Sequence, residues 1–147
     1  MKQFTPEIKK RQPERLWQYA GLQHADGVAL LGQIHEGLDG AVAGRITTWA
    51  HITQSDLRKM SGIPNTTFNR SIKARFSAEQ SERLVRIIRV LDRAVELFEG
   101  DKAEARKWLN EPARALGWKT PAEVMTSETG AYEVLRLITR IEHGVYS

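Results

Sequence analysis

Residues 54–72, QSDLRKMSGIPNTTFNRSI, have the spacing of two short helices joined by a tight turn. Leu57 and Met60 lie three positions apart, so they share the inner face of the first helix. Gly62 adopts a positive φ without steric cost, and this conformation lets the second helix pack at a steep angle to the first. Three apolar residues then anchor the second helix in the core: Ile63, Phe68 and Ile72. The stretch therefore predicts a helix-turn-helix.

The outer face of the second predicted helix carries short polar and basic side chains. Such side chains hydrogen-bond to base edges and phosphates when a helix enters the major groove of DNA. The residues predicted to contact DNA are Asn65, Thr66, Thr67, Asn69, Arg70 and Lys73. One residue departs from the usual pattern, because Arg58 stands four positions before Gly62, where a small alanine is common. Spacing alone leaves open an ordinary helix–glycine–helix corner with a polar surface.

Positive charge is concentrated in the first half of the chain. The 147 residues include 22 Lys and Arg and 18 Asp and Glu, which gives a net charge of +4. Residues 1–75 contain 11 basic and 6 acidic residues, whereas residues 76–147 contain 11 basic and 12 acidic residues. A basic first half suits a polyanion such as nucleic acid. The near-neutral second half is expected to serve another purpose.

Composition argues against several classes of protein. The content of 41% hydrophobic and 27% charged residues is ordinary for a globular protein and does not fit wholesale disorder. No apolar run approaches the ~18 residues of a transmembrane helix, and the polar N-terminus lacks the apolar core of a secretory signal, so no membrane partner is expected. The chain has no cysteine, which excludes disulfides and thiolate zinc sites and favours a cytoplasmic location.

The chain is predicted to be all-α, because helix starts are frequent and strand signals are nearly absent. Residues 77–80, SAEQ, have the form of a capping box. They precede the strongest predicted helix, at about 79–99, whose apolar stripe contains Leu84, Ile88, Leu91, Val95 and Phe98 and is broadened by Ile87, Val90 and Leu97. Further helices are expected near 102–109, 113–116, 121–125 and 131–143. Residues 37–44 contain three glycines and are expected to form a loop or a broken helix.

No catalytic or metal-binding arrangement stands out in the sequence. The four histidines are too scattered for a local ligand pair, and no serine occupies a nucleophile elbow. We therefore expect neither a cofactor nor enzymatic activity. The four tryptophans are expected to be anchors in the core or at an interface: Trp17, Trp49, Trp108 and Trp118.

The second half of the chain contains SERLVR at 81–86, ARKWLNEP at 105–112 and RIEHGVY at 140–146. With these stretches it closely resembles the toxin-binding part of the Xre/MbcA/ParS family of antitoxins. In the first half, IHEGL at 34–38 and GIPNTTFNR at 62–70 resemble the family's helix-turn-helix region more loosely.

This resemblance implies two units and two partners. It implies a helix-turn-helix domain with a basic N-terminal arm at 1–76 and a small helical toxin-binding domain at 77–147. Family members pair with a RES-domain toxin, an enzyme that attacks NAD⁺ or uses it to modify a target. They block its active site by direct contact and repress their own operon by binding operator DNA. For this chain the resemblance implies such an antitoxin, expected as a homodimer within a toxin–antitoxin hetero-oligomer.

The last helix and the residues after it are the predicted toxin-blocking element. Gly144 stands where a glycine ends a helix, so the final residues would leave the helix as a short arm. An aromatic ring and the terminal carboxylate on this arm would enter a cleft built for a dinucleotide. The predicted toxin-binding residues are Arg136, Arg140, Glu142, His143, Val145, Tyr146 and Ser147. The alternative is a frayed chain end.

Two other functions remain as alternatives. One is a stand-alone helix-turn-helix transcriptional regulator whose C-terminal domain serves dimerisation, and the absence of a neighbouring toxin gene would favour it. The other is a small enzyme, which the missing catalytic constellation disfavours.

Overall fold

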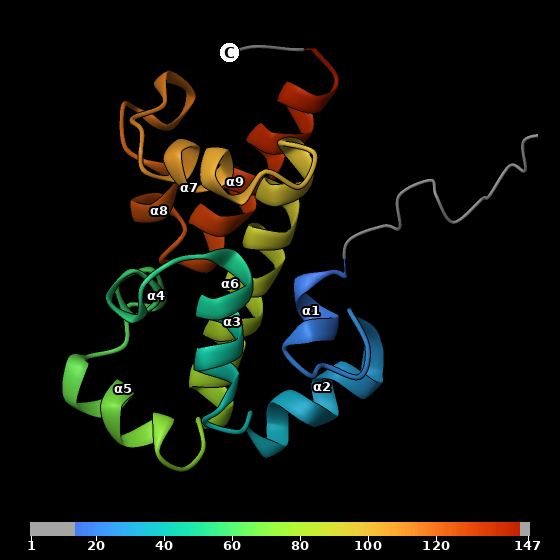
Figure 1. The fold of residues 1–147 in the computed structure, drawn as a ribbon, viewed down its shortest axis with the longest axis vertical. Helices are drawn as coiled ribbons and strands as arrows, with labels where there is room; N and C mark the ends of the chain where they lie inside the picture. The colour runs from blue at the N-terminus through green and yellow to red at the C-terminus, as the bar shows by residue number, and fades with distance from the viewer. Residues whose placement is uncertain (1–13, 145–147) are drawn as a thin grey trace, which may run out of the picture.

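The computed structural model describes residues 14–144, and these residues form helices without a β-strand, which confirms the predicted all-α class. Figure 1 shows α1 to α5 grouped toward one end of the molecule and α7 to α9 toward the other. Within the described range, no helix has the length and apolar character needed to cross a membrane. The elements are α1 (Leu16–Tyr19), α2 (Gly27–Glu36), α3 (Val42–Ala50), α4 (Gln54–Ser61), α5 (Asn65–Ile72), α6 (Ala78–Leu97), α7 (Lys102–Leu109), the 3₁₀ helix η2 (Arg114–Leu116), α8 (Pro121–Val124) and α9 (Glu128–Glu142).

Helix α6 is the longest helix of the described chain and lies at its centre (Figure 1). It begins with the predicted capping box, in which Ser77 Oγ accepts a hydrogen bond of 3.1 Å from the Gln80 N–H. In return, Gln80 Oε1 accepts one of 2.8 Å from the Ser77 N–H. Most of the predicted stripe and of the residues that broaden it is buried, whereas Leu97 and Phe98 near the end of the helix are half-buried. The buried members are Leu84, Ile87, Ile88, Val90, Leu91 and Val95. This confirms a helix that is covered on more than one side.

Elements from both halves of the chain cover α6. Helices α1, α2 and α4 contact it, and so do α7 and α9. The buried apolar side chains of all these elements belong to one hydrophobic cluster. The predicted division at residues 76 and 77 falls just before α6 and stays a prediction, but α6 itself contributes to the packing of both halves.

Two glycines bring the loop between α2 and α3 against the segment that follows α5. A Cβ atom added at Gly37 or Gly40 would collide with the backbone carbonyl oxygen of Phe76 or Ile72 respectively. Backbone hydrogen bonds of 2.9 and 3.1 Å join the same two segments. The predicted three-glycine loop is therefore a loop only in its first half, because α3 begins at Val42.

A buried carboxylate in α6 holds the start of α1. Asp92 is only 5% exposed, and its carboxylate accepts hydrogen bonds from the Leu16 N–H (2.6 Å), the Trp17 N–H (3.2 Å) and Arg15 Nε (3.3 Å). The first amides of a helix lack partners within the helix, so an acceptor at this point stabilises the turn. The sequence did not predict α1, because the acceptor that stabilises it is 76 positions away.

We expect Asp92→Ala to lower the free energy of unfolding by about 2–4 kcal/mol, because it leaves buried donors without an acceptor. Asp101→Ala is the matched control, since Asp101 Oδ1 accepts a 3.1 Å hydrogen bond from the Glu104 N–H at the exposed start of α7. Loss of that exposed cap costs about 1 kcal/mol. Urea unfolding followed by circular dichroism measures both values. Equal losses of unfolding free energy in the two variants would contradict the prediction, because Asp92 would then contribute no more than an exposed helix cap.

Candidate functional site

Helices α4 and α5 form the predicted helix-turn-helix. Thr53 Oγ1 accepts a 2.9 Å hydrogen bond from the Asp56 N–H, and the Asp56 carboxylate accepts one of 3.0 Å from the Thr53 N–H, so α4 starts with a reciprocal cap. Gly62 ends α4 with a φ of 70°, which is the left-handed conformation predicted for the turn. Leu57 and Phe68 are fully buried beneath the two helices. The cap, the glycine turn and the buried apolar residues therefore place α5 as the second helix of the helix-turn-helix.

The outer face of α5 presents the predicted DNA-contacting residues to solvent. Thr67 is half-buried, and the exposed members are Asn65, Thr66, Asn69, Arg70 and Lys73. A hollow of about 310 Å³ lies between α4 and α5, and its polar lining is made by Gln54, Ser55, Arg58, Asn65 and Asn69. Arg58, the residue that departs from the usual motif, therefore adds a positive charge to this hollow, beside the outer face of α5.

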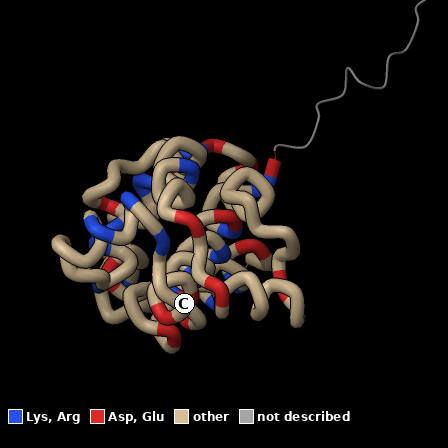
Figure 2. The backbone as a smooth tube through the Cα atoms, turned by 90° about the horizontal axis from the view of Figure 1, so that it is seen from below, with Lys and Arg blue, Asp and Glu red and all other residues tan. Residues whose placement is uncertain are grey.

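The charges on this face are not neutralised within the described chain. Among residues 14–144, no ion pair involves Arg58, Arg70 or Lys73. Figure 2, seen from this end of the molecule, shows several basic positions on the left with acidic positions among them, and α4, α5, α7 and α8 all lie on this side in Figure 1. The helix-turn-helix face is thus able to bind phosphates.

The second predicted site lies on α9, toward the other end of the molecule (Figure 1). Its inward positions Val134 and Ile138 are buried, whereas Leu135 and Ile141 are half-buried. The helix ends at the predicted glycine, because Gly144 has a φ of 74° and its N–H donates a 3.0 Å hydrogen bond to the Ile141 carbonyl. Val145, Tyr146 and Ser147 lie outside the described residues.

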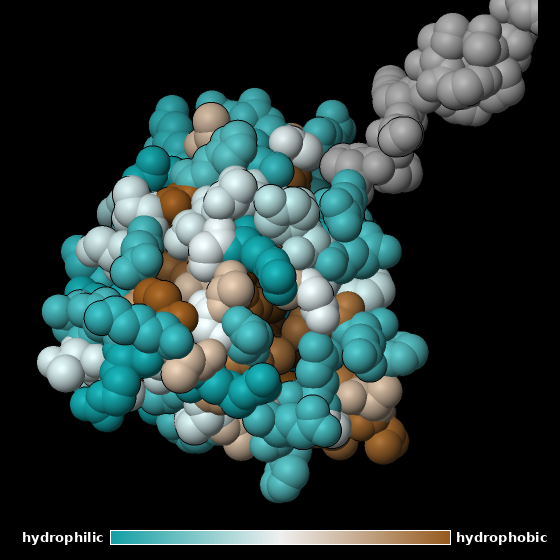
Figure 3. All heavy atoms as spheres, turned by 60° about the horizontal axis from the view of Figure 1, so that its bottom comes forward, coloured by the Kyte–Doolittle hydropathy of each residue, from teal (hydrophilic) through white to brown (hydrophobic). Residues whose placement is uncertain are grey.

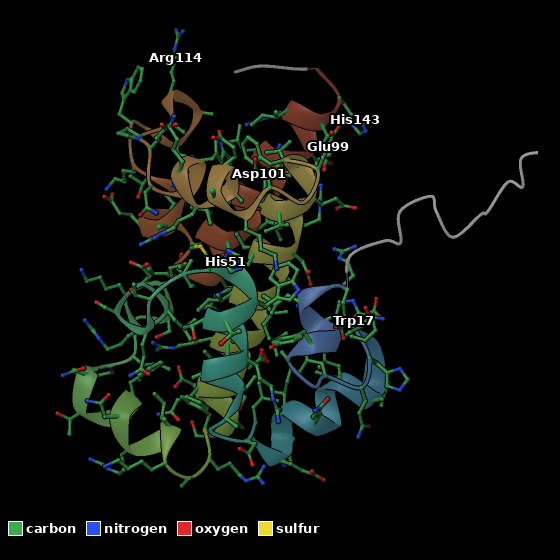
Figure 4. All side chains as sticks on the ribbon, in the orientation of Figure 1. Trp17, His51, Glu99, Asp101, Arg114 and His143 are labelled. Carbon is green, nitrogen blue, oxygen red and sulfur yellow. The ribbon has the colours of Figure 1, made fainter. Side chains whose placement is uncertain are left out.

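The basic side chains predicted to meet a toxin differ in their surroundings. Arg136 is exposed, with its guanidinium 3.4 Å from the Glu133 carboxylate and 5.8 Å from the centre of the Tyr132 ring. Arg140 is half-buried. His143 is exposed, and Figure 4 places it at the end of α9. A charged and aromatic surface therefore runs along the outer side of α9.

Glu142 has a partner inside the chain. Its Oε1 accepts a 2.7 Å hydrogen bond from Nη2 of Arg93 on α6, and the same nitrogen lies 3.2 Å from Thr139 Oγ1. Arg93 therefore fixes the last turn of α9 against α6. Sequence reasoning missed this contact because its two residues are 49 positions apart.

An exposed tryptophan lies in the loop between η2 and α8. Trp49 is buried, whereas Trp118 is 67% exposed and has a φ of 67°. A positive φ costs a non-glycine residue of order 1 kcal/mol, and such strain is concentrated at binding sites. The strained turn closes with an antiparallel bridge between residues 113 and 119. Figure 4 shows Arg114 of this loop projecting from the same end of the molecule as His143.

An ion pair joins the helix-turn-helix to the other half of the chain. Arg106 Nη2 on α7 lies 3.0 Å from Asp56 Oδ2 on α4, beside a cleft of about 410 Å³ between α4 and the α7–α8 region. Partial burial alone would raise the pKa of Asp56, but hydrogen bonds with Thr53 and the positive charge of Arg106 outweigh it and hold the pKa below its ordinary value.

The two halves match two families of domains. Residues 29–89 match the antitoxin Xre-like helix-turn-helix domain, and residues 93–144 match the antitoxin Xre/MbcA/ParS C-terminal toxin-binding domain. The chain is 38% identical to Antitoxin Xre of Photorhabdus laumondii over 100% of both chains. It is 41% identical to Antitoxin Xre of Yersinia enterocolitica over 97% of this chain and 96% of the relative. The chain belongs to the Xre antitoxin family.

A more distant relative carries a different name. The Prs ADP-ribosylating antitoxin of a Sphingobium species is 24% identical over 88% of this chain and 87% of its own length. In this Xre-family chain the helix-turn-helix match ends and the toxin-binding match begins within α6, which agrees with the packing of α6 against both halves.

We expect Arg106→Ala to lower the free energy of unfolding by about 0.5 kcal/mol at pH 7, because both partners are partly solvated. A lowered pKa of Asp56 means that its contribution is present above its unfolded value of 3.8 and is lost as pH falls through the lower native value. The difference between wild type and variant should therefore shrink as the pH falls below 3.8 and through the lower native value. Arg114→Ala, at an exposed residue, is the control. Urea unfolding at several pH values measures this, and a difference that persists in acid would contradict it.

Proposed function

We propose that this chain is an antitoxin that inhibits a RES-domain, NAD⁺-consuming toxin by blocking its active site, and that it represses its own operon through the helix-turn-helix. It acts in the cytoplasm, where operator DNA and toxin are both present, as a homodimer within a toxin–antitoxin hetero-oligomer. In this role the chain needs no cofactor and has no enzymatic activity of its own.

The observation that carries the proposal is the presence of two chemically different surfaces at opposite ends of one helical body (Figure 1). One end carries unneutralised cations on a helix-turn-helix, which is the chemistry of a DNA-binding surface. The other carries exposed aromatic and charged side chains, which is typical of an interface with a protein. One molecule is thereby able to hold DNA and toxin without competition for the same surface.

The toxin side of the proposal rests on exposed aromatic rings of α9 and of the loop before α8. Trp118 and Tyr132 are exposed by 67% and 60%, and exposed aromatic rings of this kind are common anchors in protein interfaces. ADP-ribosylation, which appears in the name of the Sphingobium relative, consumes NAD⁺. A toxin of that class has a cleft for a dinucleotide, into which the residues after α9 would insert.

For the DNA side, we expect Arg70→Ala to weaken binding to the operon's promoter by about 1–3 kcal/mol, because it removes a base or phosphate contact. Arg136→Ala is the control, since Arg136 lies on α9 at the other end of the molecule and should leave DNA affinity unchanged. Fluorescence anisotropy at fixed salt measures both. An unchanged affinity of the Arg70 variant would remove this residue from the interface.

For the toxin side, we expect the full-length chain to abolish NAD⁺ turnover by the toxin encoded beside it. Deletion of residues 145–147 should restore turnover more than it weakens binding. The helical domain would supply most of an interface of about 800 Å² per partner, while the arm controls access to the site. Turnover with saturating truncated antitoxin and calorimetric affinity measure the two effects.

The Arg70→Ala variant is the control for the truncation, because it should inhibit the toxin fully while losing DNA affinity. Full inhibition by the truncated chain would mean that the helices themselves cover the toxin's active site. Undiminished NAD⁺ turnover with the full-length chain would remove the toxin part of the proposal and leave the DNA part intact.

A further inference from the structure

Arg58 carries a positive charge that no contact within the described chain explains. The residue is half-buried and lines the hollow between α4 and α5. Its hydrogen bonds to the turn after α4 are made by its backbone carbonyl, which accepts from Ser61 Oγ at 2.7 Å and from the Gly62 N–H at 3.1 Å. Its guanidinium forms no ion pair within residues 14–144. A cation that is partly removed from water without a partner is unfavourable for folding.

The fold has other groups for the roles that a basic residue on α4 would play in stability. A cation in the last turn of a helix interacts favourably with the helix dipole, but Lys59 lies in the same turn of α4 and supplies this interaction as well. The carbonyl of Ser61, the last residue of α4, accepts a 3.2 Å hydrogen bond from Arg83 on α6. Arg58 is therefore dispensable for both roles.

The hollow around Arg58 has the chemistry of an anion-binding site. The other polar residues that line it are Gln54, Ser55, Asn65 and Asn69. None of the described lining residues is acidic, and amide and hydroxyl groups donate hydrogen bonds to phosphates and base edges. Asn65 and Asn69 also belong to the predicted DNA-contacting face of α5, so the hollow borders that face. Figure 3 shows that hydrophilic residues predominate at the lower left, the side on which α4 and α5 lie in Figure 1.

The place of Arg58 on the first helix of the motif favours a phosphate over a base edge. When a helix-turn-helix binds DNA, the second helix enters the major groove while the first crosses the sugar–phosphate backbone. Arg58 lies four positions after Gln54 and three after Ser55, so the three side chains share one side of α4. The planar guanidinium of arginine matches two phosphate oxygens with parallel N–H groups.

We propose that Arg58 binds a phosphate of the DNA backbone at the mouth of this hollow. The contact fixes α4 on the backbone and thereby sets how α5 lies in the major groove, because phosphate contacts determine the register and orientation of a protein on DNA. This inference rests on DNA binding in the proposed function and adds to it a contact from the first helix. Arg58 is thus a positioning residue, and its charge finds a partner only when DNA is bound.

The decisive measurement is the salt dependence of DNA affinity in the full-length chain. Arg58→Met keeps the apolar stem and removes the charge. We expect it to weaken binding to the operon's promoter about tenfold, and to reduce the slope of log affinity against log salt concentration by about 0.9, the value for one phosphate. Arg58→Lys should restore the slope but only part of the affinity, because it keeps the charge and loses the planar fork.

Lys59→Met is the matched control for these variants. Lys59 is the next residue on α4 and has the same charge, but it lines the cleft toward α7 and α8 on another side of the helix. Both its affinity and its salt slope should stay near the wild-type values. Fluorescence anisotropy between about 50 and 200 mM salt measures all of these quantities.

Arg58→Ala separates a DNA contact from a structural role. It should bind DNA as weakly as Arg58→Met does. Its unfolding temperature should equal or exceed that of the wild type, because alanine favours the helix and removes an unpaired, half-buried cation. Thermal unfolding followed by circular dichroism measures the temperature. A lower unfolding temperature together with weaker DNA binding would mean that Arg58 acts on the fold, and it would overturn the proposal.

A duplex of random sequence and equal length distinguishes a phosphate contact from a base contact. Loss of a phosphate contact weakens binding to both DNAs by a similar factor, whereas a loss confined to the promoter would overturn the phosphate assignment. If Arg58→Met keeps its affinity and slope while Arg70→Ala weakens binding, the Arg58 contact is overturned and DNA binding by α5 stands. A wild-type chain that does not bind the promoter would overturn both claims.

Discussion

The burial of α6 on nearly all sides is the constraint on which the rest of the structure depends. Its apolar side chains from Leu84 to Val95 face several directions, so the helix is stable in water only when other helices surround it. Burial of each such side chain contributes about 1.5–3 kcal/mol. Because the surrounding helices come from both halves of the chain, the helix-turn-helix and the α9 surface are attached to one common axis.

Polar side chains of α6 determine how the surrounding helices are placed. Ser81 Oγ accepts a 2.8 Å hydrogen bond from a backbone N–H of the loop before α3, and Asp92 holds the start of α1. Arg83 donates a 3.2 Å hydrogen bond to the last carbonyl of α4 at the turn of the helix-turn-helix, while Arg93 fixes the end of α9. A buried polar group is costly unless it is paired, so these bonds favour one arrangement of helices over other packings of the same apolar faces.

The two surfaces differ in the physical basis of their binding. The α4–α5 face offers cations and short polar groups, whose attraction to DNA is long-ranged and falls steeply with salt. The α9 end offers aromatic rings and partly engaged charges, whose binding depends on shape and on the exclusion of water. The ion pair between Asp56 and Arg106 joins the two regions, but its partial exposure makes it a weak connection.

The sequence by itself determined the features that local spacing encodes. The capping box at Ser77, the turn at Gly62 and the stripe of α6 each depend on residues within a few positions of one another, and the structure has all of them. The outward face of α5 followed from the same helical period, including its exposed Arg70.

Only the tertiary structure decided the features that depend on distant partners. Helix α1 exists because Asp92 accepts its first amides, and α9 is fixed because Arg93 reaches Glu142. The exposure of Trp118 follows from the way its loop leaves the core. These pairs are separated by tens of residues, and no periodicity or local motif specifies which side chains meet once the helices have packed around α6.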